Sequence, residues 1–124
     1  ATKHAVEGYS ESLDHELRTW GIRVSVIEPA YTKTGFDANL LEPDAKLDEY
    51  RIVRTALEKT VKKVMAKAEG PEVVAETVLK AANAMQPKMR YPAGKLAGRL
   101  QLLRRYAPAG VMDMGIRKDL RLDA

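Results

Sequence analysis

The chain has 124 residues, a formal net charge of +4 and no cysteine, so it can form one small domain but no disulfide, thiolate metal site or cysteine nucleophile. It contains neither a signal peptide nor an apolar run of about 18 residues, which predicts no membrane span and fits a reducing, cytoplasmic location. Residues 1–85 hold 12 Lys/Arg and 14 Asp/Glu, whereas residues 86–124 hold 9 and 3, so the basic character belongs to the C-terminal third.

The first predicted element is a helix over residues 2–20. Its apolar residues recur at steps of three and four, which gives one stripe: Val6, Tyr9, Leu13, Leu17 and Trp20. Gly21 is a typical C-terminal stop. The run from Ile22 to Glu28 is β-branched and apolar on both faces, which predicts a central parallel strand that ends before Pro29. Ligands bind beyond the carboxyl ends of such strands, so the segment Pro29 to Thr34 is the first candidate site.

The remaining elements alternate with clear breaks. Residues 35–45 read as a loop, followed by a predicted helix over about 46–68. The sequence Gly70-Pro71-Glu72 is a helix start, because proline suits the first helical position and an acid favours the positive end of the dipole. That helix should run to about Met85, with Met85 facing inward.

The C-terminal third is predicted to hold one strand and one or two helices. Residues 88–93 read as a short edge strand, since Pro92 fits an edge better than a centre. A basic amphipathic helix follows over residues 95–106, and Pro108 and Gly110 should break it. Residues 111–124 either form one more short helix or fray.

The resulting order of elements, α-β-α-α-β-α, predicts an α/β fold that is rich in helix and has two short parallel strands. Two strands alone make a marginal sheet. We therefore expect residues 1–124 to form a single incomplete domain, the C-terminal half of a doubly wound Rossmann-type fold.

Residue types alone offer few candidate sites. His4 and His15 lie eleven positions apart on one helix without a third ligand, so no metal site is expected. The aromatic residues are too scattered for a nucleic-acid stacking platform. The basic C-terminal third reads first as a solvated surface, and second as a site for an anionic partner or a membrane surface.

Two motifs resemble the short-chain dehydrogenase/reductase family. Residues 1–13 resemble the helix that follows the family's catalytic tyrosine, with Lys3 at the lysine of the Tyr-x-x-x-Lys pattern. The segment Pro29-Ala30-Tyr31-Thr32-Lys33-Thr34 resembles the Pro-Gly-x-(Val/Ile)-x-Thr motif at the matching distance. The resemblance is strong for residues 1–34 and weaker after residue 86. It implies a parent enzyme that interconverts an alcohol and a carbonyl with NAD or NADP.

The resemblance also implies roles for individual residues. Lys3 would be catalytic and would bind the cofactor, because a lysine one helical turn from a tyrosine lowers the tyrosine pKa and can reach the nicotinamide ribose. The cofactor-binding residues implied by the second motif are Pro29, Ala30, Thr32 and Thr34, and Tyr31 would face the substrate. Residues 35–69 would form the substrate-side loop and helix. Ala30 departs from the motif, which usually has glycine there.

The family's tyrosine would lie two positions before Ala1, and its serine and glycine-rich turn earlier still, so the isolated 124-residue chain is expected to be inactive. The expected partners are a small alcohol or carbonyl substrate, and either a second copy of the chain or the missing N-terminal half, but no nucleic acid. The alternative is a non-catalytic interaction module that binds a partner chain or a membrane surface through its first helix and its basic C-terminal tail.

Overall fold

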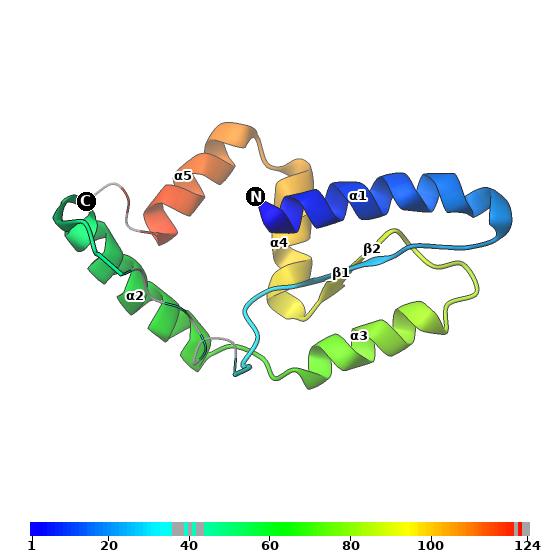
Figure 1. Cartoon of the computed structure of the whole chain (residues 1–124), viewed down its shortest axis with the longest axis horizontal. Coiled ribbons are helices and arrows are strands. Elements are labelled where there is room, and N and C mark those ends of the chain that lie inside the picture. The colour runs from blue at the N-terminus through cyan, green and yellow to red at the C-terminus, as the bar shows by residue number, and fades with distance from the viewer. Residues whose placement is uncertain (36–38, 40, 42–43, 121, 123–124) are drawn as a thin grey trace. The chain divides into compact units, whose positions relative to one another are not determined.

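The computed structural model describes residues 1–35, 39, 41, 44–120 and 122. It divides into two compact units: residues 1–30 with 71–98 form the first unit, and residues 31–70 with 99–124 form the second. The described part of the chain holds five α-helices and two strands, which Figure 1 labels. The predicted α/β class, rich in helix with two parallel strands, is confirmed. The single incomplete domain over residues 1–124 stays a prediction.

The first unit begins with helix α1, Thr2–Leu17, which continues as a short 3₁₀ helix, Arg18–Trp20. Gly21 then takes the left-handed conformation, with φ 73°, as its place after the helix predicts. The predicted apolar stripe is buried only in part. Leu13 and Leu17 are half-buried, whereas Val6, Tyr9 and Trp20 are 56%, 68% and 79% exposed.

Strand β1, Val26–Pro29, pairs in parallel with strand β2, Arg90–Ala93. The predicted start at Ile22 is wrong. The amide of Val24 donates to the Asp14 carboxylate at 2.8 Å and so is bonded to a side chain rather than to a neighbouring strand. The predicted edge strand around Pro92 is confirmed. Pro29 is the last residue of β1 and lies opposite Ala93.

The two faces of this small sheet are covered differently. Side chains alternate along a strand, so Glu28 and Arg90 share one face while Ile27 and Tyr91 share the other. Helix α3, Glu72–Ala82, packs against both strands, and Tyr91 and Ala93 are buried. Figure 1 shows α1 and α3 on opposite sides of the strands, which is the layering of a doubly wound α/β fold.

Helix α3 ends earlier than its sequence pattern predicts. The last turn closes at Asn83, whose side-chain amide donates to the Leu79 carbonyl at 2.8 Å. Met85 therefore lies beyond the helix and is 100% exposed, so its predicted inward position is wrong.

The second unit holds helix α2, Arg51–Ala66, preceded by a 3₁₀ turn, Asp48–Tyr50. The predicted start near residue 46 was too early. Helix α4, Lys95–Tyr106, has the predicted bounds and continues from the first unit into the second.

Helix α5, Ala109–Asp119, follows Pro108, whose extended backbone separates it from α4. Pro108 and Gly110 were predicted to break the helix over residues 95–106. That helix ends before Pro108 as predicted, whereas Gly110 lies in the first turn of α5. Part of the predicted loop over residues 35–45 lies outside the described residues.

Candidate active site

The carboxyl ends of β1 and β2 lie at the same edge of the sheet, because the strands are parallel. Pro29 and Ala93 face each other there, and the chain continues through Ala30 on one side and Gly94 on the other. Gly94 has φ 92°, a conformation that glycine adopts readily and side chains rarely allow. This edge is where open α/β sheets bind ligands. The segment predicted from sequence to be functional therefore begins at the expected place.

The second half of that segment is held by a neighbour that the sequence did not indicate. Thr32 pairs in parallel with Glu69, and the Lys33 amide donates to the Glu69 carbonyl at 2.9 Å. Thr32 is half-buried, whereas Tyr31 and Thr34 are exposed. The pairing ties residues 31–34 to the chain immediately before α3.

Lys3 lies on the first turn of α1 and is exposed. Glu7 and Glu11 follow it at intervals of four, so the three side chains run along one side of the helix. Lys3, Pro29 and Ala30 belong to the first unit, and Tyr31, Thr32 and Thr34 belong to the second. The roles given to these six residues stay predictions.

Each unit, taken separately, holds a side chain that fits part of a nicotinamide nucleotide. In the first unit Lys3 carries an exposed ammonium, and in the second unit the exposed Thr34 carries a hydroxyl. Cation and hydroxyl donors of this kind bind ribose hydroxyls and amide groups. Within the described residues, no group of three or more His, Cys, Asp or Glu side chains could hold a metal ion.

An ion-pair cluster joins α1 to both strands. The Arg90 guanidinium donates from Nη1 to Glu28 Oε1 at 2.6 Å and to Glu7 Oε2 at 3.1 Å, and from Nη2 to Glu11 Oε2 at 3.1 Å. The Arg90 side chain is 33% exposed. These carboxylates, Glu28 foremost, raise the pKa of Arg90 above its usual value. One guanidinium thus holds two turns of α1 and the residue that precedes Pro29.

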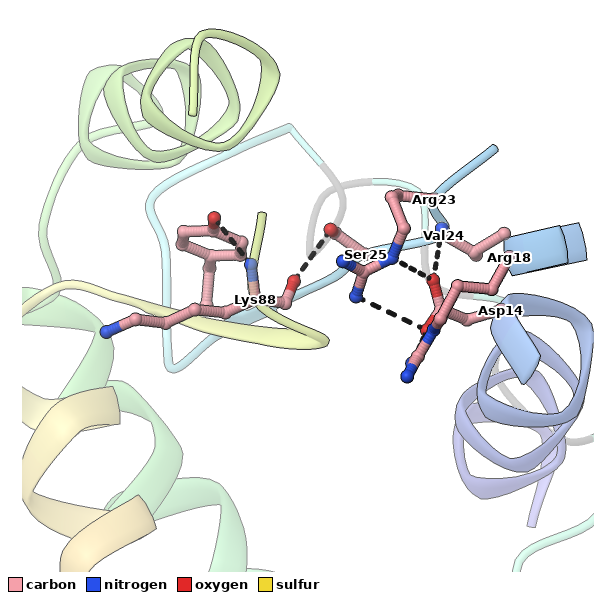
Figure 2. A network of polar contacts seen from close by, with 7 residues as sticks. Asp14, Arg18, Arg23, Val24, Ser25 and Lys88 are labelled. Atoms are coloured by element: carbon pink, nitrogen blue, oxygen red, sulfur yellow. Dashed lines mark hydrogen bonds and ion pairs between the residues drawn. The ribbon is translucent and has the colours of Figure 1, made fainter. Parts of the chain in front are cut away.

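A second cluster, centred on Asp14, joins the end of α1 to the chain before β1. Figure 2 shows the Asp14 carboxylate, which is fully buried, between Arg18, Arg23 and the Val24 amide. Arg23 Nε donates to Asp14 Oδ1 at 2.9 Å, and Arg18 donates to Asp14 Oδ2. Bonds from Arg23, then Arg18, then the Val24 amide lower the pKa of Asp14 far below its usual value. Asp14 acts here as a structural anchor.

A neutral hydrogen-bond chain holds the start of the strand pair. Ser25 Oγ donates to the Lys88 carbonyl at 2.7 Å, as Figure 2 shows. The Lys88 amide donates to the Tyr91 hydroxyl at 2.9 Å. The bond from the Val26 amide to the Met89 carbonyl, at 2.7 Å, continues this ladder. The residues just before β1 and β2 are therefore joined by hydrogen bonds that do not involve the ion pairs.

Sequence reasoning missed both charged clusters. A signal was available, because Glu28 and Arg90 are charged residues within short apolar strands, where a charge needs a partner. Glu7, Glu11 and Asp14 lie outside the apolar stripe of α1. The clusters show that part of the polar side of α1 packs against the strands.

Comparison with known proteins supports the family resemblance. The family model described as short chain dehydrogenase matches residues 1–45. The Escherichia coli uncharacterized oxidoreductase YbbO is 35% identical over 116 residues, covering 91% of this chain and 39% of the relative. The Helicobacter pylori probable short-chain type dehydrogenase/reductase VdlC is 29% identical, covering 91% and 42%. The human dehydrogenase/reductase SDR family member 9 is 28% identical, covering 90% and 39%.

The chain belongs to the short-chain dehydrogenase/reductase family. It spans about two fifths of the length of these relatives, 39% of YbbO and 42% of VdlC. YbbO is described as an oxidoreductase and VdlC as a probable short-chain type dehydrogenase/reductase. Among the described helices, none is both long enough and apolar enough to cross a membrane.

Proposed function

We propose that the intact protein is an NAD(P)-dependent oxidoreductase that interconverts an alcohol and a carbonyl compound. The single observation that carries the proposal is the place of the Pro29–Thr34 segment, which leaves the carboxyl end of a parallel strand in a chain whose first helix carries Lys3. A nicotinamide cofactor, when bound, supplies the hydride that this reaction needs.

Each residue of the chain would then have a defined task. The Lys3 ammonium would hold the nicotinamide ribose hydroxyls and stabilise a neighbouring phenolate, because a fixed positive charge favours both contacts. Pro29 and Ala30 would line the nicotinamide ring. A backbone group of Thr32 and the hydroxyl of Thr34 would hold the carboxamide, and Tyr31 would face the substrate.

Isotope transfer tests the proposed reaction. We expect the purified intact protein to move deuterium from C4-labelled NADH or NADPH to the carbonyl carbon of an aldehyde or ketone, detected by mass spectrometry of the alcohol. A panel that runs from short to lipophilic carbonyls covers the substrate class. Oxidation of the cofactor without label in any alcohol would contradict direct hydride transfer.

The exposed residues of α1 support a protein partner for this unit. Val6 and Tyr9 on α1, and Trp20 on the 3₁₀ helix that follows it, are large apolar residues that are mostly exposed, and exposed apolar residues of this kind favour an interface. These residues would be covered by a second copy of the chain or by the rest of the protein.

A second candidate function, membrane-surface binding, is favoured by α4. Leu96, Leu100 and Leu103 recur on one side of this helix and are 41%, 46% and 51% exposed. Arg99 and Arg104 flank them, and residues 77–112 contain no Asp or Glu. An exposed leucine row between cations is typical of a helix that lies on an anionic lipid surface.

Vesicle sedimentation of the intact protein tests this second candidate. Binding to vesicles of phosphatidylcholine and phosphatidylserine should exceed binding to phosphatidylcholine alone, and Arg99→Gln or Arg104→Gln should each weaken it about fivefold. Lys62→Gln on α2 removes the same charge elsewhere and serves as the control. Equal binding to both vesicle types, or no binding, would contradict the proposal.

A further inference from the structure

Arg90 connects the two segments that carry the predicted site in the first unit. Its carboxylate partners come from α1 and β1, and Arg90 itself lies on β2. The contacts are therefore between separate elements, far apart in sequence, and not within one helix. All of these residues lie in the first unit.

The partners of Arg90 adjoin predicted site residues on both sides. Glu7 lies one helical turn after Lys3 on the same side of α1. Glu28 directly precedes Pro29 in β1. A chain of contacts thus runs from the turn that carries Lys3, through one guanidinium, to the end of the strand that leads into the cofactor segment.

We propose that Arg90 is a positioning residue, which fixes the helix that carries Lys3 relative to the Pro29–Ala30 end of β1. This inference rests on the proposed function, since it gives Arg90 its effect through Lys3 and the cofactor segment. Arg90 touches neither substrate nor cofactor in this assignment.

The charges of the cluster explain why arginine is required. Three carboxylates surround one guanidinium, and the planar fork of arginine can donate to several oxygens at fixed angles. Without the guanidinium, Glu28 would repel Glu7 and Glu11, which would loosen α1 from the strand. Lysine would keep one positive charge but could not reproduce the fork.

The Asp14 cluster provides a matched control within the same unit. Arg18 binds Asp14, four residues before it, so Arg18→Met removes an ion pair without breaking the ion pairs that join Glu7, Glu11 and Glu28 to Arg90. We expect Arg18→Met to lower the melting temperature and leave the kinetic constants unchanged well below it.

The experiment compares wild type, Arg90→Met, Arg90→Lys and Arg18→Met in the intact protein. We expect Arg90→Met to raise the cofactor KM and lower kcat, each about tenfold, at temperatures where all variants are folded. Arg90→Lys should recover part of both losses and also provides a milder variant if Arg90→Met does not fold. Amide hydrogen exchange should rise together in residues 1–11 and 28–34 of Arg90→Met, but not in Arg18→Met.

The outcomes separate the two proposals. An active wild type whose Arg90 variants, Arg90→Lys included, show only a lower melting temperature would overturn the positioning role and leave the proposed function intact. A wild type without dehydrogenase activity would contradict the proposed function. Hydrogen exchange alone would then show whether Arg90 couples residues 1–11 to residues 28–34. Unchanged exchange in either of the two segments would overturn the coupling.

Discussion

Replacing Lys3 with alanine in the intact protein should lower turnover by about 100- to 10,000-fold, the usual range for lost acid–base assistance. The free energy of unfolding should change by less than about 0.5 kcal/mol, because Lys3 is exposed on the first turn of α1 and an ordinary surface site contributes little. The loss should appear in kcat and in cofactor binding together, since one ammonium serves both. Steady-state kinetics and thermal melting of both proteins measure these effects.

Two further variants sharpen the test of Lys3. Lys3→Arg should restore activity only in part, because a planar guanidinium does not replace a compact ammonium. Lys80→Ala removes an exposed lysine from α3, outside the candidate site, and should leave kcat nearly unchanged. Near-normal turnover of Lys3→Ala with an unchanged melting curve would mean that Lys3 is a surface residue and that the match over residues 1–13 is wrong.

Asp14→Asn should give the largest loss of stability among single changes in the first unit. The buried carboxylate accepts hydrogen bonds from two guanidinium groups and the Val24 amide, and a neutral amide cannot replace the charge. We expect the melting temperature of the intact protein to fall by roughly 5 °C or more at neutral pH. Glu16→Gln removes an exposed acid from the same helix and should have little effect.

The same carboxylate should make stability fall in acid. The pKa of Asp14 is lowered on folding, so at a pH below its usual value of 3.8 the unfolded chain binds a proton that the native chain does not. The stabilisation is therefore complete above that value and is lost as the pH falls toward the native pKa. Urea unfolding between about pH 3 and pH 6 should show a smaller acid slope for Asp14→Asn than for wild type. Identical slopes would contradict the role of Asp14.

The sequence predicted those features of the fold that depend on a few neighbouring residues, such as the ends of some helices. Gly21 ended the first helix region as expected, and the basic helix over Lys95–Tyr106 has the predicted bounds. The error at the start of β1 arose because contacts beyond the neighbouring residues decided the outcome. Ile22 and Val24 are β-branched and suit a strand, but the bonds from Val24 to Asp14 and from Ser25 to Lys88 hold this stretch outside the ladder.

The sequence predicted the positions of the candidate site, but it did not predict the contacts that hold those positions in place. The parallel register placed Pro29 at the ligand-binding edge, as the sequence indicated. The pairing of Thr32 with Glu69 joins positions 37 residues apart, and no local pattern predicts it. The three partners of Arg90 likewise come from segments 62 to 83 positions away. Propensity and periodicity describe neighbours along the chain, so such contacts need a structure.

A crystal structure of the intact protein with bound NAD or NADP tests the central claim most directly, because it locates the nucleotide relative to named atoms. The account predicts Lys3 Nζ within hydrogen-bond distance of the nicotinamide ribose hydroxyls, and the Thr34 hydroxyl at the carboxamide. Arg90 should still join Glu7, Glu11 and Glu28. A nucleotide bound with its nicotinamide away from both Lys3 and the Pro29–Thr34 segment would contradict the assignment of the site.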